Sequence, residues 1–210
     1  MLIITIKQGK EKSLLERDPL IYASAVERVD GKPGERNQMG ATAIVQTSSG
    51  EFLARAAHNP KSQIRGRVWT FDPNEAVDHG MIKRRTKAAI AKRTKKKAPP
   101  GQPIRLIVGE EDGLPGLLVD WYNGSPAYLV CQFQAAGVDA WKVPIVQTLI
   151  AETGCQNVYE RADELLRKGE GLPVLSGALA GNAPPDDIQI IEDNVRYAIN
   201  IKTGQKIRFK

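Results

Sequence analysis

Short apolar runs separated by turn-forming residues fill the first 72 positions of the chain. The β-branched run Leu2–Ile6 predicts a strand, and three further strands are predicted over residues 41–46, 51–57 and 63–71. Residues 13–17 predict a single helical turn, because the proline that follows pushes its preceding residue out of the α region. Many short strands with one helical turn predict a small, mostly β, barrel-like domain over residues 1–72.

Two stretches of this region have a less regular pattern. Residues 20–26 are mainly apolar and fit either a strand or an irregular segment. Residues 30–36 read Asp-Gly-Lys-Pro-Gly-Glu-Arg, which is dense in turn formers and predicts a loop.

The pattern changes at residue 73. Sparse apolar residues at helical spacing predict a helix that begins at Pro73 or Glu75 and runs to about Lys97. The Pro- and Gly-containing residues that follow have the composition of a linker. Residues 73–103 are therefore expected to be a basic helix and a linker between two domains.

The second half, residues 104–210, reads as an α+β domain. One main helix is expected within residues 139–152, where apolar residues recur every four positions and Gly154 stops the pattern. Residues 162–168 predict a helical turn and residues 169–185 a long loop. The predicted strands lie at residues 104–108, 117–121, 128–133, 157–161, 189–192 and 196–201. This order predicts a sheet with one main helix against it, a β-β-α-β-β arrangement.

Composition places the chain among globular proteins. Apolar residues make up 41% and charged residues 26% of its 210 positions, and no run of about 18 apolar residues predicts a membrane span. The N-terminus has its apolar residues before its charges, the reverse of a secretory signal, so we expect a cytoplasmic protein. Cys131 and Cys155 are too few for a disulfide framework and are expected to be buried thiols.

The positive charge is concentrated in the middle of the chain. The net charge is +6, yet residues 73–103 carry nine basic residues against two acidic ones, and residues 104–210 are net acidic. Between Lys83 and Lys97, nine of fifteen residues are basic and none is acidic. Such a run is either a solvated helix face or a surface for a polyanion, where each neutralised phosphate releases counterions.

A second basic feature lies on the predicted strand over residues 63–71. Alternation places Arg65, Arg67 and Trp69 on one face of that strand. Arginines beside a tryptophan suit RNA, because they pair with phosphates and the ring stacks on a base. The alternative is a solvated face with a partly buried tryptophan.

The chain has no recognisable catalytic motif. Glu110, Glu111 and Asp112 form an acidic cluster, but a turn between strands is where solvated carboxylates normally occur. His58 and His79, the only histidines, share no motif. Neither a P-loop, a G-x-G-x-x-G after a strand, a nucleophile elbow nor a Cys/His metal pattern is present. We therefore expect no catalytic, cofactor or metal residues in this chain.

Several motifs together resemble one known family. These are GKEKSLL at residues 9–15, AHNPKSQIRGRVW at 57–69, GEEDGLPGL at 109–117, YERAD at 159–163 and GEGL at 169–172. Their order and spacing are similar to the N-terminal half of the bacterial 23S rRNA large subunit methyltransferase I family, which uses S-adenosylmethionine to methylate cytosine C5. The resemblance covers essentially the whole chain. It implies an N-terminal PUA domain, a connecting helix and a central α+β domain.

The same resemblance implies that the catalytic domain is missing here. In the family, a Rossmann-like domain with the cofactor loop and catalytic cysteine follows, and its motifs do not occur in these 210 residues. Residues 203–206 resemble the family's entry motif, but residues 207–210 depart from it, which suggests a frameshift or a truncation. Residues 18–22 also depart from the family's His-Pro-Trp-aromatic-Phe pattern. S-adenosylmethionine is thus expected as a cofactor only of full-length members. A separate chain that carries the catalytic domain is a further expected partner.

The sequence therefore predicts an RNA-binding portion of an rRNA methyltransferase, with 23S rRNA as the expected partner. Each basic residue is expected to neutralise a phosphate, with Trp69 as a stacking group. The expected RNA-binding residues are Lys7, Lys10, Lys12, Arg17, Arg65, Arg67, Trp69, Lys83, Arg84, Arg85, Lys87, Lys92 and Arg93. The acidic second domain is expected to position a catalytic domain or to dimerise. The alternative is an accessory protein–protein module, a homodimer or one whose basic helix meets an acidic partner.

Overall fold

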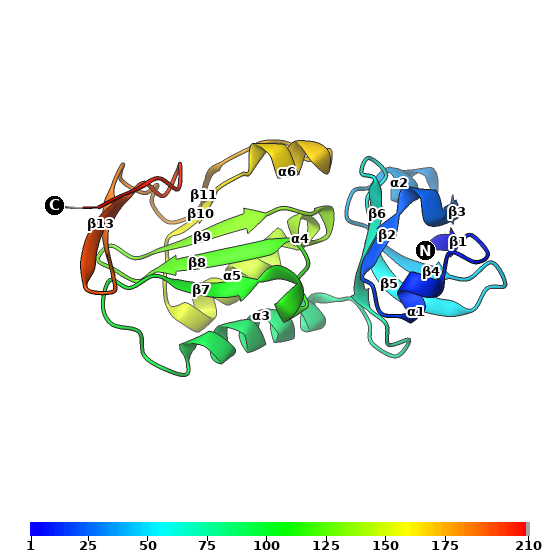
Figure 1. Ribbon diagram of the computed structural model, residues 1–210, viewed down its shortest axis with the longest axis horizontal. Helices are drawn as coiled ribbons and strands as arrows, with labels where there is room; N and C mark the ends of the chain where they lie inside the picture. The colour runs from blue at the N-terminus through cyan, green and yellow to red at the C-terminus, as the bar shows by residue number, and fades with distance from the viewer. Residues whose placement is uncertain (209–210) are drawn as a thin grey trace.

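The computed structural model describes residues 1–208, and shows two domains side by side along the long axis of the molecule (Figure 1). The last two of the family-divergent residues 207–210 lie outside the described part. The N-terminal domain is one curled six-stranded sheet in the order β2-β6-β5-β4-β1-β3. Its strands are β1 (Leu2–Ile6), β2 (Leu20–Tyr22), β3 (Val26–Asp30), β4 (Thr42–Gln46), β5 (Phe52–His58) and β6 (Ile64–Thr70). The predicted mostly β, barrel-like domain is confirmed.

Alternation along the strands builds the core of this domain. Ile4, Ile6, Val45 and Ala54 are fully buried inside the curled sheet, as expected for strands with one face turned inward. The short helix α1 (Lys12–Leu15) adds Leu14 to this core. β1 runs parallel to β4 and antiparallel to β3, so the N-terminal strand lies inside the sheet rather than at its edge.

Of the two less regular stretches of the N-terminal domain, residues 20–26 combine the two predicted alternatives, and residues 30–36 differ from the predicted loop. Residues 20–26 form β2, a 3-10 turn (Ala23–Ala25) and the start of β3. The predicted loop over residues 30–36 contains the helix α2 (Pro33–Asn37). Pro33 suits the first turn of a helix, and the Glu35 carboxylate accepts a hydrogen bond from the Lys32 backbone N–H at 3.1 Å. Turn-forming residues here start a helix.

The C-terminal domain has a five-stranded sheet in the order β11-β10-β9-β8-β7. Strands β7 (Ile104–Val108), β8 (Leu117–Tyr122), β9 (Tyr128–Phe133) and β10 (Val158–Glu160) occur where the sequence predicts them. β9 and β10 are parallel, and α4 (Ala136–Ala140) and α5 (Lys142–Thr153) form the crossover between them. The α+β class is confirmed. The predicted loop over residues 169–185 is wrong at one point, because it contains the edge strand β11 (Gly177–Ala180).

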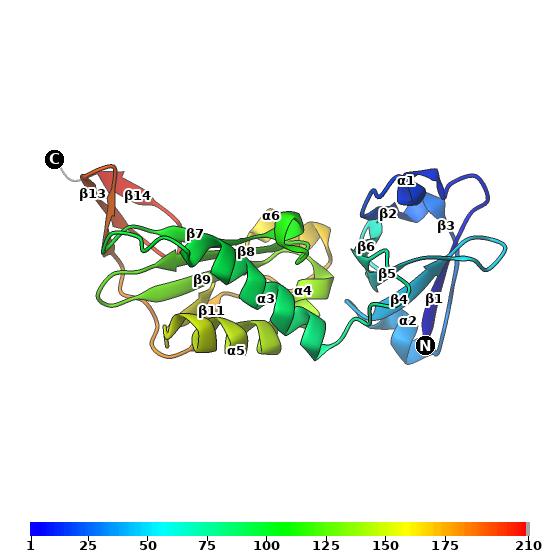
Figure 2. The same cartoon turned by 90° about the horizontal axis from the view of Figure 1, so that it is seen from below.

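Two helices, not one, cover a face of this sheet. α3 (His79–Thr94) packs beside α5 and against β7 (Figure 2). Met81, Ile82 and Ile90 of α3 are buried in the core of the C-terminal domain. The predicted linker helix is therefore part of this domain. It also begins later than Pro73 or Glu75, because Asp78 caps it by accepting a hydrogen bond from the Met81 N–H at 2.8 Å.

The chain closes with a small separate sheet in the order β12-β13-β14. β12 (Ile188–Glu192) and β13 (Val195–Ile199) confirm the predicted closing pair, and β14 (Lys206–Arg208) adds a third strand. Ile190 and Ile201 pack with Tyr122 and Tyr159 of the larger sheet. α6 (Glu164–Gly169) confirms the predicted helical turn over residues 162–168. Among residues 1–208, no helix is both long and apolar enough to cross a membrane.

Candidate nucleic-acid interface

Trp69 lies at the junction of the two domains and not on an RNA-accessible surface. Its side chain is only 4% exposed and belongs to the core of the C-terminal domain, although it comes from β6 of the N-terminal domain. A Cβ atom at Gly137 would lie 2.7 Å from the Ala57 Cβ and 3.0 Å from the Trp69 ring, so a side chain there would have to displace its neighbours. The predicted base-stacking role is therefore wrong for this structure, because a ring with no free face cannot stack on a base.

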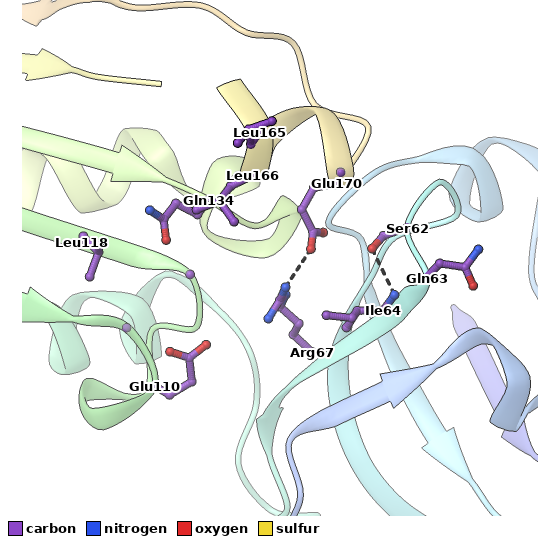
Figure 3. Close-up of a pocket in the computed structure, with 13 residues that line it drawn as sticks. Ser62, Gln63, Ile64, Arg67, Glu110, Leu118, Gln134, Leu165, Leu166 and Glu170 are labelled. Atoms are coloured by element: carbon purple, nitrogen blue, oxygen red, sulfur yellow. Dashed lines mark hydrogen bonds and ion pairs between the residues drawn. The ribbon is translucent and has the colours of Figure 1, made fainter. Parts of the chain in front are cut away.

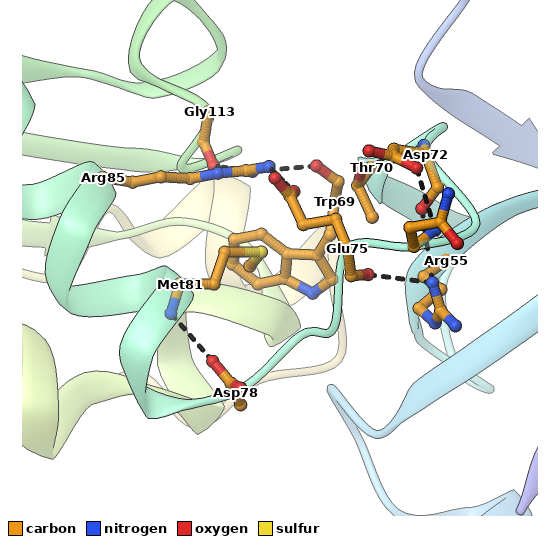
Figure 4. A network of polar contacts seen from close by, with 10 residues as sticks. Arg55, Trp69, Thr70, Asp72, Glu75, Asp78, Met81, Arg85 and Gly113 are labelled. Carbon is orange, nitrogen blue, oxygen red and sulfur yellow. Dashed lines mark hydrogen bonds and ion pairs between the residues drawn. The ribbon is translucent and has the colours of Figure 1, made fainter.

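Arg85 of α3 also points into the junction (Figure 4). Its Nη1 donates to the carbonyl oxygens of Trp69 and Gly113, both at 2.8 Å, and its Nη2 pairs with Glu75 at 2.5 Å. Arg55 of β5 donates from the other side to the Glu75 carbonyl at 2.8 Å. The two guanidinium groups fix the segment between the domains, so Arg85 is occupied by protein and not free for a phosphate.

Two further predicted phosphate ligands are paired within the protein. Arg93 bonds the Leu106 carbonyl at 2.9 Å and the Asp112 carboxylate at 2.7 Å, and only 16% of its side chain is exposed. Arg67 pairs with Glu170 of the other domain at 2.7 Å. Asp112, part of the acidic cluster, also accepts from the Val108 N–H at 2.7 Å. Its carboxylate is therefore structural.

The Arg67–Glu170 pair lines a cleft of about 500 Å³ between β6 and the C-terminal domain. Figure 3 shows the two side chains meeting across it, with Glu110 and Gln134 on the C-terminal side. The Glu170 carboxylate also accepts from the Asn59 amide at 2.9 Å. Asn59 and Glu170 are 111 residues apart, and no local pattern predicts this contact.

The basic residues of α3 that remain exposed to solvent lie on its outward face. Lys83 and Arg84 are exposed and make no ion pair within residues 1–208. Lys87 lies 3.4 Å from Glu152, and Lys92 lies 4.0 Å from Asp112, with more than half of each lysine side chain exposed. Because both ammonium groups stay in contact with water at these distances, the two ion pairs contribute little and leave the lysines open to a phosphate. The outward face of α3 is thus a basic surface.

The predicted residues around the first turn are exposed as well. Lys7 donates to the Ser24 carbonyl at 2.9 Å, and Lys12 lies 4.0 Å from Glu16 on its own helix. Lys10 makes no ion pair among the described residues, and Arg17 lies over the Phe71 ring at 4.9 Å. These four side chains stay accessible, so their contact with RNA remains a prediction.

Two kinds of reactive group, metal clusters and free thiols, were sought among the described residues. No cluster of three or more His, Cys, Asp or Glu side chains that could hold a metal occurs within residues 1–208. Cys131 is fully buried, and burial raises the pKa of its thiol, so the thiolate is not populated at neutral pH. Burial also raises the pKa of Cys155.

Comparison with known proteins shows which proteins this chain is similar to. Residues 4–71 match the family model of a PUA-like domain. The chain is 40% identical over 207 residues to the ribosomal RNA large subunit methyltransferase I of Aliivibrio fischeri, and 40% over 208 residues to that of Photobacterium profundum. These matches cover 98% of this chain but only 50% and 51% of the relatives.

The chain matches the N-terminal half of the ribosomal RNA large subunit methyltransferase I family. It spans about half the length of the curated relatives that it matches.

Two solved structures share the fold of this chain. A putative SAM-dependent methyltransferase from Streptococcus mutans superposes with a TM-score of 0.73 over 97% of this chain and 50% of its own. A putative methyltransferase in complex with SAH gives 0.74 over 99% and 50%. Both are 15% identical to this chain, so the likeness concerns the fold of the two domains alone.

Proposed function

We propose that this chain is the RNA-binding portion of a ribosomal RNA methyltransferase and that it binds 23S rRNA. The observation that carries the proposal is the outward face of α3, where Lys83 and Arg84 stand exposed without an acidic partner beside a PUA-like domain. Each lysine or arginine that neutralises a phosphate releases condensed counterions, which favours binding in low salt. The relatives' printed names, which describe an rRNA methyltransferase, support RNA as the polyanion.

Methyl transfer is assigned to none of the described residues. A solved protein of the same fold is described as SAM-dependent, and this chain matches only half of it. S-adenosylmethionine is therefore proposed as the cofactor of full-length relatives. Titration of the chain with S-adenosylmethionine by calorimetry tests this assignment, and saturable heat would contradict it.

The proposal is tested by measuring affinity for a 23S rRNA fragment by fluorescence anisotropy across a series of salt concentrations. The double variant Lys83→Ala, Arg84→Ala should reduce the slope of log K against log[salt] by about 0.7 to 0.9 per lost contact. The matched control is Arg196→Ala, Lys202→Ala, which removes two exposed cations from β13 and from the turn that follows it. If the salt slope falls equally in both double variants, or falls in neither, α3 is not part of the RNA surface.

An accessory protein–protein role is the second candidate, and one observation favours it. Leu165 of α6 is 84% exposed and Leu175 is 68% exposed, in a domain whose charge is net acidic. Exposed large apolar side chains that gather into one patch are typical of contact surfaces, and Leu166, next to Leu165 on α6, is also 46% exposed. Light scattering should then show a dimer for the wild-type chain and a monomer for Leu165→Gln, Leu175→Gln, whereas a wild-type monomer would exclude self-association.

A further inference from the structure

A basic pocket lies at the open seam of the N-terminal sheet. β2 and β3 are the two edges of that sheet, and the 3-10 turn Ala23–Ala25 joins them. Beside this turn is a cavity of about 540 Å³. Its polar and charged walls come from β3, α2, β5 and β6, namely Arg28, Arg36, Asn37, His58 and Arg65. We call it the seam pocket. It is separate from α3, and although it shares β6 with the interdomain cleft, none of its lining residues also lines that cleft.

The seam pocket is electrostatically one-sided. Three arginines line it, and no aspartate or glutamate does. Arg28 is partly neutralised, because Glu27 and Asp30 lie 3.0 Å and 2.9 Å from its guanidinium group. Within residues 1–208, Arg36 and Arg65 make no ion pair. Arg65 instead donates to the Pro60 carbonyl. Arg67, two residues later on the same strand, differs because its guanidinium group is paired with Glu170.

His58 holds the Arg36 wall of the pocket in place. Its ring is 2% exposed, and its Nε2 lies 3.1 Å from the Arg36 carbonyl oxygen, which makes Nε2–H the donor. Burial lowers the pKa of His58, and the positive charge of Arg65 lowers it further. The ring is therefore neutral at pH 7 and ties the end of α2 to the end of β5. Arg36 is thus placed by a buried hydrogen bond to its backbone, although its side chain is exposed.

We infer that the seam pocket binds one phosphate group of an RNA strand, with Arg36 and Arg65 as its two guanidinium donors. Planar guanidinium groups match phosphate oxygens in a bidentate manner. The one aromatic ring among the lining residues, that of His58, is buried and has no free face to stack on a base, so the contact reads the backbone and not the sequence. This inference rests on the proposed RNA binding and adds a defined phosphate position to it, on a domain that charge density along the chain does not single out.

The first arm of the test measures RNA affinity. Arg36→Gln should weaken binding of a labelled single-stranded 23S rRNA segment by about tenfold and lower the salt slope by about 0.7. Arg36→Lys should keep the salt slope but recover only part of the affinity, because it retains the charge and loses the guanidinium fork. The matched control is Lys32→Gln, which removes the same charge from an exposed residue just before α2 and outside the pocket. Equal losses for Arg36→Gln and Lys32→Gln would overturn the pocket, because they would show only a diffuse charge effect.

The second arm separates the pocket from the proposed function. Inorganic phosphate is titrated into the 15N-labelled chain while the Nε–H signals of the arginines are followed by NMR. Saturable shifts are expected for Arg36 and Arg65, and they should vanish in Arg36→Gln. If the chain binds no RNA but phosphate still shifts these signals, the proposed function fails and the anion site stands. If RNA binds with an unchanged salt slope in Arg36→Gln and phosphate shifts neither signal, the pocket is wrong and the proposed function stands.

Discussion

The inward and outward basic residues of α3 share one charge run in the sequence but have different environments in the structure. Arg85 and Arg93 point inward, where each bonds backbone carbonyls and a carboxylate. Lys83, Lys87 and the other outward residues keep most of their surface in water. A guanidinium group presents several donors in a fixed plane, so it can join carbonyls and carboxylates from different segments, whereas an ammonium is a compact, strongly hydrated charge. On α3 the two inward arginines, Arg85 and Arg93, therefore hold the structure together, whereas the lysines and Arg84 provide the exposed charge.

The largest expected effect concerns Trp69, whose backbone carbonyl accepts a hydrogen bond from the inward Arg85. Trp69→Ala should cost about 3 to 5 kcal/mol of unfolding free energy, because it leaves a cavity in the core shared by the two domains. The control is Tyr22→Ala on β2, where the ring is 50% exposed and the change should stay within about 0.5 kcal/mol. Urea unfolding followed by circular dichroism measures both. A Trp69→Ala protein of unchanged stability but reduced RNA affinity would restore the stacking role.

A smaller effect sharpens the comparison within α3 itself. Arg85→Met should cost about 2 to 3 kcal/mol, because it leaves Glu75 and two carbonyl oxygens without their donor. Arg84→Met, one residue earlier and exposed, should change stability by less than about 0.5 kcal/mol.

RNA binding should show the opposite order for the same two variants. Arg84→Met should weaken binding of a 23S rRNA fragment and lower its salt slope, and Arg85→Met should leave the slope unchanged in the folded protein. Anisotropy titrations at several salt concentrations, made well below the melting temperature of each variant, measure this. Equal stability losses in the two variants would mean that the inward and outward faces are not distinct.

Local pattern is enough to predict most strands of this molecule. β1, β4, β5, β6 and the first strands of the C-terminal sheet follow from short apolar runs between turn residues, because one face of each strand is buried. The errors arise where local and tertiary signals differ. α3 has few apolar residues and looks like a solvated linker, yet Met81, Ile82 and Ile90 suffice to bury one side of it. α2 starts within residues rich in turn formers because proline is favoured in the first helical turn.

The site was less predictable than the fold. A run of charge identifies α3, but sequence spacing does not tell which of its cations meets a carboxylate from a distant segment. Strand alternation predicted Arg65, Arg67 and Trp69 on one face of β6, but Arg67 and Trp69 face the other domain and not solvent, whereas Arg65 lines the seam pocket. Arg36 stands alone in the sequence, and only the curl of the sheet brings it near Arg65. These contacts depend on how the two domains and the two sheet edges meet.

The smallest expected effect concerns His58, an inward basic group that stays neutral. Burial is the main cause that lowers its pKa from the usual 6.5. Below pH 6.5 the unfolded chain binds a proton that the folded chain does not, so the free energy of unfolding should fall as the pH drops from 6.5. Glu35 and Glu164, whose pKa values are also lowered, act only below 4.5, so the two effects do not overlap above pH 5.

Urea midpoints at pH 8, 7, 6 and 5.5 measure the effect of His58. The wild-type chain should lose stability relative to His58→Gln over this range, because glutamine keeps a donor for the Arg36 carbonyl but does not titrate. His79→Gln, at the exposed first turn of α3, is the matched control and assigns the titration to one of the two histidines. A wild-type profile that is parallel to that of His58→Gln would mean that the ring is not buried as a neutral group. In that case the end of α2 would be free to move, and the seam pocket would lose the contact that places Arg36.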